Sequence, residues 1–233
     1  MEAIILAGGF GTRLSKVIKD LPKPMALING TPFLEIILNH LNSSGFNTII
    51  LSVGYMSQYL IDHFGDSYKD LKILYSIEDY PLGTGGAIKQ SLELCTDDHI
   101  YILNGDTFLN IKFKEVEKKW FKYSLPIMIS RYVDDVTRYG SLSFKNKILK
   151  TFSEKKKSGP GFINAGCYVL PKDIMQQFVL EETFSFENNC IEKIMKNKKF
   201  LIYNHEEFFI DIGTPEDFDL AQEKLMPYLK ATS

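Results

Sequence analysis

The first half of the chain alternates short apolar runs with segments of helical periodicity. The apolar runs are rich in isoleucine, leucine and valine, and they fall at residues 2–6, 48–53, 71–77 and 99–106. The segments between them repeat their apolar positions as a helix does, at residues 33–41, 56–64 and 86–95. This alternation of strands and helices predicts an α/β protein with a mostly parallel sheet.

The second half is richer in strands and poorer in helices. Strand-like runs fall at residues 125–132, 140–144, 148–153 and 162–170, and two helices then precede a last run at 208–212. We expect these strands to extend the first sheet into a mixed one. No linker, internal repeat or low-complexity tract interrupts the pattern, so we predict one domain over residues 1–233.

Capping residues mark the ends of two predicted helices. Thr31 stands where an N-cap would lie, with Pro32 in the first turn, and Gly45 follows the end of the same helix. The last helix begins at Thr214 and Pro215, and an acid three residues after Thr214 completes a box-like cap.

The predicted parallel strands all end in glycine or in an acid. The first strand runs into Gly8 and Gly9, the second into Gly54, the third into Glu78 and the fourth into Asp106. In an open parallel sheet, ligands bind outside the carboxyl ends of the strands. We therefore expect one crevice to collect all of these ends.

Composition excludes several classes of protein. The formal net charge of -2 and the lack of a long basic run disfavour a general nucleic-acid binder. No segment reaches the roughly 20 apolar residues of a membrane helix, and the N-terminus lacks the features of a signal peptide. The cysteines Cys95, Cys167 and Cys190 are scattered in apolar surroundings, which favours reduced thiols in a cytoplasmic protein.

The glycine-rich segment after the first strand matches neither common nucleotide motif. Gly9, Gly11 and Leu14 occupy the positions of the dinucleotide fingerprint, but the third glycine and the later acid are missing. The P-loop also fails, because Arg13 and Leu14 replace its Gly-Lys pair. A simple tight turn is the structural alternative. Arg13 and Lys23 favour phosphate binding instead, because a guanidinium fork and a point charge both suit phosphate oxygens.

Two acids have the character of magnesium ligands. Asp106 follows an apolar strand, and Asp211 lies between apolar residues just before the last helix. Mg²⁺ is usually held by one or two carboxylates together with substrate phosphates. Each aspartate alone is as well explained by a turn or a helix cap. Together with a phosphate-binding loop, the pair favours magnesium-assisted phosphoryl or nucleotidyl transfer.

An ordered set of motifs resembles the sugar-1-phosphate nucleotidyltransferases, also called nucleotide-sugar pyrophosphorylases. The motifs are LAGGFGTRL, PKPM, PLGTGGA, NGD, FSEK, NAGCYVL, SFE and DIGTPEDF, and they span nearly the whole chain. Within the family, the sequence is most similar to the D-glycero-α-D-manno-heptose 1-phosphate guanylyltransferases, followed by the mannose-1-phosphate guanylyltransferases. The resemblance implies a three-layer, Rossmann-like fold with a mostly parallel mixed sheet, a nucleotide-binding half near residues 1–110 and a sugar-phosphate half near 111–233.

The resemblance also implies a role for each matching residue. The catalytic set would be Arg13 on the departing phosphates, Lys23 on the α-phosphate, and Asp106 and Asp211 as Mg²⁺ ligands. The nucleotide would contact Leu6, Ala7, Gly8, Gly9, Gly11, Thr12, Arg13, Lys23, Gly54, Gly83, Thr84 and Gly85. The sugar 1-phosphate would contact Asn104, Gly105, Tyr139, Gly140, Glu154, Lys155, Asn164, Gly166 and Glu187. On composition alone, the segment around Lys155 also fits a solvated charged loop, and Gly166 also fits close backbone packing.

The expected reaction transfers a nucleotidyl group from an NTP, expected to be GTP, to D-glycero-α-D-manno-heptose 1-phosphate, giving a GDP-sugar for surface polysaccharide synthesis and releasing pyrophosphate. Relatives often have Pro-Leu-Thr-like residues after the arginine motif, whereas this chain has SKVIKD, which leaves the exact sugar open. UTP, dTTP, CTP and mannose 1-phosphate remain alternatives. A glycosyltransferase and a non-catalytic regulatory homologue are rivals from other classes. The chain ends without the hexapeptide repeats of bifunctional relatives, so we expect no acyltransferase activity, and a homodimer is compatible with its aromatic content.

Overall fold

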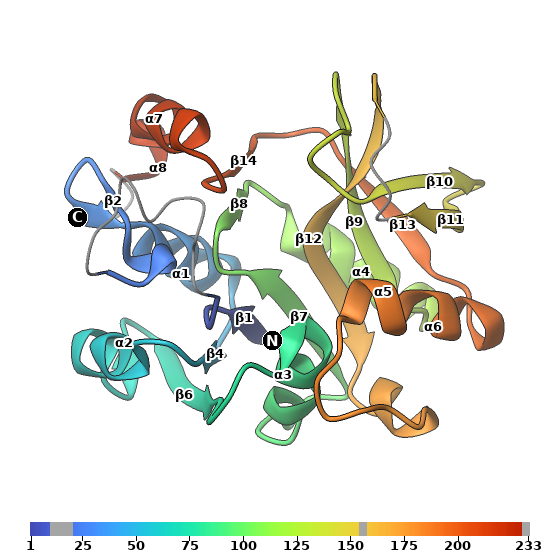
Figure 1. The fold of residues 1–233 in the computed structure, drawn as a ribbon, viewed down its shortest axis with the longest axis horizontal. Helices are drawn as coiled ribbons and strands as arrows, with labels where there is room; N and C mark the ends of the chain where they lie inside the picture. The colour runs from blue at the N-terminus through green and yellow to red at the C-terminus, as the bar shows by residue number, and fades with distance from the viewer. Residues whose placement is uncertain (10–20, 154–157, 230–233) are drawn as a thin grey trace.

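A single sheet of ten strands organises the described part of the chain. The computed structural model of the protein describes residues 1–9, 21–153 and 158–229. Within them the strands follow the order β10-β11-β13-β9-β12-β7-β1-β4-β6-β5 (Figure 1). Their bounds are β1 Glu2–Leu6, β4 Thr48–Val53, β5 Ser67–Tyr68, β6 Leu71–Ile77, β7 His99–Asn104, β9 Ile127–Val133, β10 Ser141–Lys145, β11 Ile148–Ser153, β12 Gly161–Pro171 and β13 Leu201–His205.

The sheet is parallel from β7 through β1 and β4 to β6, its edge strand β5 is antiparallel to β6, and it is mixed beyond β7. Strand β1 pairs in parallel with both β4 and β7, and β4 pairs in parallel with β6. The chain thus leaves β1 in one direction for β4 and β6, and later returns to its other side as β7. Beyond β7, strand β12 is antiparallel to β7 and β9, whereas β13 is parallel to β9. The predicted mixed α/β sheet is confirmed, and its order reverses at β1.

Helices cover both faces of this sheet and make three layers. One face carries α1 Phe33–Ser44, α2 Ser57–Phe64, α4 Phe113–Tyr123, α7 Pro215–Lys224 and α8 Met226–Leu229 (Figure 1). The other carries α3 Gly83–Leu92, α5 Phe186–Asn189, α6 Ile191–Asn197 and the short 3₁₀ helix η2 Ile174–Gln177. Strand β1 shows why both faces are covered: Ala3 and Ile5 enter one core, and Ile4 enters the other. A strand buried on both sides reads as a continuous apolar run, as this one does.

Two small strand pairs connect distant parts of the chain. Strand β14 Phe209–Asp211 pairs antiparallel with β8 Thr107–Leu109, and this register places Asp211 opposite Thr107. Strands β2 Leu27–Ile28 and β3 Thr31–Pro32 form a hairpin before α1. The β8–β14 pair is the more important one for function, because it brings the C-terminal acid next to the end of β7.

Four local expectations differ from the structure, and the first is strand β13 Leu201–His205 of the main sheet, which was not predicted. Helix α4 was not predicted, although Phe113, Val116 and Trp120 form its buried stripe at helical spacing. Helix α3 begins at Gly83, earlier than the predicted residue 86. The cap at Thr31 is wrong, because Thr31 lies in β3 and Pro32 occupies the N-cap without a side-chain cap hydrogen bond.

The two other predicted helix ends are confirmed. Gly45 follows α1 in the left-handed conformation, with φ of 91°. At the start of α7, the backbone N–H of Asp217 donates to the Thr214 hydroxyl at 3.3 Å, and that hydroxyl donates to the Asp217 carboxylate at 2.8 Å.

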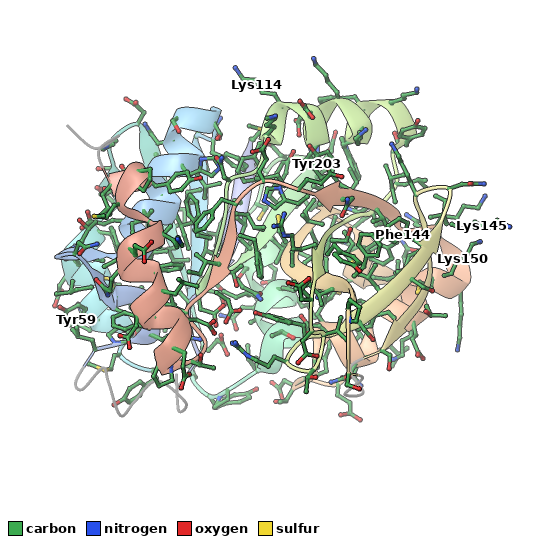
Figure 2. All side chains as sticks on the ribbon, turned by 90° about the horizontal axis from the view of Figure 1, so that it is seen from above. Tyr59, Lys114, Phe144, Lys145, Lys150 and Tyr203 are labelled. Carbon is green, nitrogen blue, oxygen red and sulfur yellow. The ribbon has the colours of Figure 1, made fainter. Side chains whose placement is uncertain are left out.

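Three lysines on the surface of the protein point into solvent. Figure 2 shows Lys114 on α4, and Lys145 and Lys150 on the β10–β11 hairpin, extending away from the body of the protein. All three are exposed.

In the described ranges, no helix has both the length and the apolar character needed to cross a membrane.

Replacing Gly83 with alanine should destabilise the fold more than the same replacement at a left-handed glycine with open space around its Cβ position. Gly83 has φ of 68°, and a Cβ there would lie 2.6 Å from the backbone oxygen of Phe184, which cannot rotate away. Gly45 has a similar positive φ but nothing within 4 Å of its Cβ position, so Gly45→Ala is a matched control. We expect urea denaturation to show an additional loss of about 1–3 kcal/mol in the free energy of unfolding for Gly83→Ala. Equal losses in the two variants would contradict the close packing of Gly83 on Phe184.

Candidate functional site

A cavity of about 560 Å³ opens at the carboxyl ends of β1, β4, β6 and β7. It lies where the strand order reverses around β1, which is the usual ligand position in an open α/β sheet. Its volume is within the range of small-molecule sites. Its walls are Leu6, Ala7, Gly8, Gly9, Lys23, Pro24, Ser52, Gly54, Tyr55, Glu78, Asp79, Tyr80, Pro81, Gly83, Thr84, Ala87, Asn104, Gly105 and Asp106. The four strand ends therefore meet in one crevice, as the sequence predicts.

Close backbone contacts bring these strand ends together. The Ala7 N–H donates to Ser52 O at 2.8 Å, which ties the end of β1 to the end of β4. The Gly105 N–H donates to Leu6 O at 2.9 Å, which ties the turn after β7 to β1. A Cβ at position 105 would lie only 2.7 Å from that Leu6 oxygen, so this approach requires glycine. The residue after it, Asp106, is thereby held at the cavity wall.

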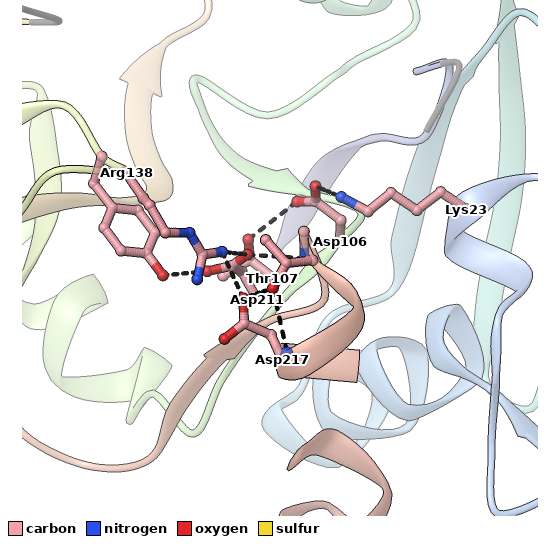
Figure 3. Close-up of polar contacts among 9 residues, drawn as sticks. Lys23, Asp106, Thr107, Arg138, Asp211 and Asp217 are labelled. Carbon is pink, nitrogen blue, oxygen red and sulfur yellow. Dashed lines mark hydrogen bonds and ion pairs between the residues drawn. The ribbon is translucent and has the colours of Figure 1, made fainter. Parts of the chain in front are cut away.

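Lys23 reaches the same wall from a separate segment. It begins the short 3₁₀ helix η1 Lys23–Met25, where the Met25 N–H donates to Pro22 O at 2.8 Å. Pro24 and Met25 are buried and anchor the segment. The Lys23 ammonium pairs with Asp106 Oδ2 at 2.5 Å, and the lysine side chain is only 15% exposed (Figure 3). A fixed cation thus faces the cavity beside a carboxylate.

Asp211 lies close to Asp106 but is held by different partners. Its neighbour Ile212 donates its N–H to Asp106 O at 2.9 Å, which joins the two acidic segments. The Asp211 carboxylate accepts hydrogen bonds from the Gly213 N–H at 2.9 Å, from Arg138 Nη2 at 3.3 Å and from the Tyr139 hydroxyl (Figure 3). These bonds leave the carboxylate in a defined orientation beside Asp106.

Arg138 and Tyr139 act as a clamp on that carboxylate. Arg138 Nη2 also pairs with Asp217 Oδ2 at 2.5 Å, and this hydrogen bond raises the pKa of the guanidinium. Burial and the hydrogen bond to Asp211 raise the pKa of Tyr139, so its hydroxyl remains a proton donor at neutral pH. The resemblance assigned Tyr139 to the sugar pocket, and its hydroxyl is directed to Asp211.

The predicted sugar-side residues form a second cluster beside the cavity. Glu187 accepts hydrogen bonds from the Thr84 hydroxyl at 2.6 Å and from the Tyr168 hydroxyl at 3.4 Å. The Asn164 amide donates to the same Tyr168 oxygen at 2.5 Å, and the Asn164 backbone N–H donates to the oxygen of Gly140 at 2.9 Å. None of Asn164, Gly140 and Glu187 lines the cavity itself.

Asn104 and Gly166 join the cavity to this second cluster. Gly166 has φ of 69°, and a Cβ there would overlap the Asn104 side-chain amide. Asn104 lines the cavity, whereas Gly166 belongs to β12. Five predicted site residues lie outside the described ranges, so the structure does not place them: Gly11, Thr12, Arg13, Glu154 and Lys155.

The cavity also contains polar and aromatic residues that the sequence did not identify as site residues. Glu78 directly follows β6, and its carboxylate accepts from the Leu82 N–H at 3.0 Å and from the Ser52 hydroxyl at 3.3 Å. Tyr55 and Tyr80 line the same wall and are about half exposed. The position of Glu78 at a strand end was the available signal for it. No pattern in the sequence pointed to Arg138, whose partners come from β14 and α7.

Two acids fit a divalent cation that shares its coordination with a substrate. Asp106 and Asp211 offer hard carboxylate oxygens on adjoining segments, and such oxygens suit Mg²⁺. Among the residues placed by the structure, no cluster of three or more His, Cys, Asp or Glu side chains could hold a metal alone. The donor set is therefore too small for a closed protein site and is appropriate for a cation completed by phosphates.

The cysteines do not contribute a reactive group. Cys95, Cys167 and Cys190 are free and buried. Burial raises the pKa of the Cys95 thiol to about 12 and that of Cys190 to about 11, and it also raises the pKa of Cys167. At neutral pH all three are protonated, and a thiol reacts only as the thiolate.

Known proteins of similar length are similar to this chain in sequence. The chain is 39% identical over 230 residues to the D-glycero-alpha-D-manno-heptose 1-phosphate guanylyltransferase of Aneurinibacillus thermoaerophilus, covering 98% of this chain and 100% of the relative. It is 43% identical over 220 residues to the enzyme of the same name from Campylobacter jejuni subsp. jejuni serotype O:2, covering 94% and 97%.

Solved structures and a family model agree with this similarity. The crystal structure of HddC from Yersinia pseudotuberculosis matches with a TM-score of 0.86 at 37% identity, over 96% of this chain and 99% of HddC. A second HddC structure, complexed with GMP-PN, matches with a TM-score of 0.85. The family model described as "Nucleotidyl transferase" matches residues 2–226. The chain therefore belongs to the nucleotidyl transferase family.

Proposed function

We propose that this protein transfers a guanylyl group from GTP to D-glycero-α-D-manno-heptose 1-phosphate, giving the GDP-heptose and pyrophosphate. The observation that carries this proposal is the cavity at the strand-order reversal, where Lys23 and Asp106 face one another. Relatives of the same length that carry the heptose guanylyltransferase name support the choice of sugar and base. The enzyme would act in the cytoplasm. The activated heptose would then serve the synthesis of a surface polysaccharide, either capsule or lipopolysaccharide.

The proposed chemistry needs no protein nucleophile. A phosphate oxygen of the sugar 1-phosphate attacks the α-phosphorus of the nucleotide, the new P–O bond forms, and the bond to the leaving pyrophosphate breaks. The attacking oxygen is already anionic at neutral pH, so the protein must position two polyanions and offset their repulsion. Lys23 supplies a fixed positive charge for the α-phosphate, and Arg13 would contact the departing phosphates.

Mg²⁺ would add charge neutralisation at the reacting phosphates when bound. Asp106 and Asp211 would hold it, and Arg138 and Tyr139 would keep the Asp211 carboxylate directed toward it. Outer partners of this kind fix the orientation of a ligand and tune its affinity.

Removing the second acid should weaken metal binding measurably. We expect Asp211→Asn to lower the affinity for Mn²⁺, used as a spectroscopic probe for Mg²⁺, by about tenfold in the presence of GTP. Electron paramagnetic resonance of free Mn²⁺ measures this without requiring turnover. Asp219→Asn is the control, because Asp219 is exposed on α7 and has no assigned ligand role. An unchanged Mn²⁺ affinity in Asp211→Asn would remove Asp211 from the proposed metal site.

The cavity offers a physical reason for choosing guanine. Guanine has adjacent N–H donors at N1 and N2, whereas uracil and thymine place one donor between two carbonyl acceptors. A carboxylate only accepts hydrogen bonds, so Glu78 suits guanine and repels the carbonyls of uracil and thymine. Tyr55 and Tyr80 on the same wall supply flat apolar surfaces for a base.

The remaining site residues would bind the nucleotide in the first half of the domain and the sugar phosphate mainly in the second half. The glycines from 8 to 11 and from 83 to 85 would approach the nucleotide closely in the first half. Asn104, Gly140, Asn164, Gly166, Glu187 and the segment at Glu154 and Lys155 would contact the sugar phosphate. A homodimer is a further proposal that none of these contacts requires.

A substrate panel tests the proposed function. Pyrophosphate release is measured with GTP, UTP, dTTP and CTP, each with D-glycero-α-D-manno-heptose 1-phosphate and with mannose 1-phosphate, in the presence of Mg²⁺. We expect release with GTP and the heptose phosphate, and about a hundredfold slower release with the Asp106→Asn control. Preference for another pair would overturn the specificity and leave the reaction class in place. No release from any pair would favour a glycosyltransferase or a non-catalytic homologue.

A further inference from the structure

The Thr84 hydroxyl lies between the cavity and the segment that carries Glu187. Thr84 is the second residue of α3 and lines the cavity, so its position in the sequence points to the nucleotide. Its hydroxyl nevertheless donates to Glu187 Oε2 at 2.6 Å and accepts from the Phe186 N–H at 2.9 Å. A residue on the nucleotide side is thus bonded directly to a proposed sugar ligand.

These bonds leave the Thr84 hydroxyl without a proton for the nucleotide. A hydroxyl has one donor and two acceptor sites, and Glu187 takes the donor. Hydrogen bonds to a carboxylate are about twice as strong as neutral ones, and this one is short. A nucleotide presents mainly acceptor oxygens in its phosphates and base carbonyls. The Thr84 side chain could donate to them only by releasing Glu187.

Both carboxylate oxygens of Glu187 have further hydrogen-bond partners. Its Oε2 accepts from the Ser185 hydroxyl at 3.0 Å, and its Oε1 accepts from the Tyr168 hydroxyl at 3.4 Å. The Tyr168 oxygen in turn accepts from the Asn164 amide at 2.5 Å. Thr84, Glu187, Tyr168 and Asn164 therefore form a continuous hydrogen-bonded chain, which ends at a second proposed sugar ligand.

Tight packing fixes the two segments that meet in this chain. The Gly85 N–H donates to Phe184 O at 2.9 Å, although these residues lie far apart in the sequence. Phe184 and Phe186 are buried, and the Phe186 ring packs edge-on against Tyr168 with centroids 5.0 Å apart. With the backbone held, the orientation of the Glu187 carboxylate depends on its hydrogen bonds. A carboxylate oriented before the substrate arrives binds it at a lower entropic cost.

We propose that Thr84 is a positioning residue for the sugar 1-phosphate, acting through Glu187, although it lies in the wall of the nucleotide cavity. This inference rests on the proposed function, which assigns the sugar phosphate to Glu187 and Asn164. Loss of the Thr84 hydroxyl releases the carboxylate from one side of its hydrogen-bonded chain. Sugar-phosphate binding then weakens, and nucleotide binding does not.

The test separates the KM values of the two substrates. Thr84→Val keeps the shape of the side chain and removes the hydroxyl, and we expect it to raise the KM for the sugar 1-phosphate about tenfold. The KM for the NTP should stay within about twofold of wild type. Thr84→Ser restores the hydroxyl and should return the sugar KM to near the wild-type value. A purely structural role would not produce this split.

Two further variants keep the test decisive if Thr84→Val folds poorly. Tyr168→Phe breaks the same chain beyond Glu187, without affecting the Phe186 N–H, and should also raise the sugar KM alone. Thr96→Val is the matched control, because its exposed hydroxyl also donates to a glutamate, Glu2 Oε1 at 2.6 Å, and Glu2 lies at the opposite end of β1 from the cavity. We expect its two KM values to equal those of wild type.

A double-mutant cycle identifies Glu187 as the route of the effect. In a Glu187→Gln background, Thr84→Val should add less than about a twofold change to the sugar KM, because residues that act through one another are not additive. Multiplicative effects, or a raised NTP KM with an unchanged sugar KM, would overturn the inference. A wild-type protein that turns over no substrate pair would overturn the proposed function itself, and the positioning role with it.

Discussion

Replacing Lys23 with alanine will lower kcat by about a hundredfold or more while the protein remains folded. Lys23 is a cation of the cavity wall, paired with Asp106 at 2.5 Å. Charge builds up on the α-phosphorus oxygens during attack, and a preorganised cation in a partly buried site stabilises that charge. Loss of one such contact typically costs on the order of 3 kcal/mol, which corresponds to about a hundredfold in rate. Steady-state kinetics with GTP and the heptose phosphate measures the effect, and circular dichroism checks the fold.

Two companion variants show whether the charge itself is responsible. Asp106→Asn should lower kcat by a similar factor, because it removes the partner of Lys23 and a proposed metal ligand. Lys72→Ala removes an equivalent charge from an exposed position on β6 and should leave kcat unchanged. A Lys23→Ala enzyme with near wild-type turnover would exclude Lys23 from the chemistry, whatever its place in the cavity.

Replacing Glu78 with glutamine will reduce the preference for GTP over UTP by about 10- to 100-fold in kcat/KM. A bidentate contact to a base edge provides about 1–3 kcal/mol of discrimination. The glutamine oxygen can still accept from the Leu82 N–H, so the local structure is retained. Its amide group presents donors where the carboxylate presented an acceptor, and this favours the carbonyls of uracil. Competition between the two nucleotides in one reaction measures the ratio directly.

The neighbouring acid distinguishes a specific contact from a general charge effect. Asp79 lines the same cavity and is exposed, so Asp79→Asn removes the same charge without changing the predicted base contact. We expect its preference for GTP over UTP to match that of wild type. If both substitutions shift the preference equally, Glu78 acts through its charge alone and does not read the base.

The strands that are buried on both faces were predictable, because they read as continuous apolar runs in the sequence. Ile4, Ile50 and Ile102 lie at equivalent positions of three paired parallel strands, and runs of this composition read clearly as buried strands. Helix α4 was missed because its surface is highly charged, and only the spacing of Phe113 and Trp120 marks its buried face. The Thr31 cap failed because a local signature does not reveal that β3 pairs with β2.

The sequence pointed to several residues that the structure brings together, but it did not reveal how they are connected. Strand ends and lone acids in apolar surroundings pointed to Asp106 and Asp211. The sequence could not reveal that Arg138 joins Asp211 to Asp217, because this clamp requires the loop after β9 to meet β14 and α7. The bond between Thr84 and Glu187 was equally hidden, since tertiary packing alone brings these segments together.

Isotopic labelling of the sugar phosphate tests the central claim most directly. D-Glycero-α-D-manno-heptose 1-phosphate with ¹⁸O in its non-bridging phosphate oxygens is incubated with GTP and Mg²⁺, and the products are analysed by mass spectrometry. If the sugar phosphate attacks the α-phosphorus, all of the label will appear in the GDP-heptose and none in pyrophosphate. Label in pyrophosphate or in free inorganic phosphate, or pyrophosphate formed without a labelled nucleotide sugar, would contradict nucleotidyl transfer at this cavity.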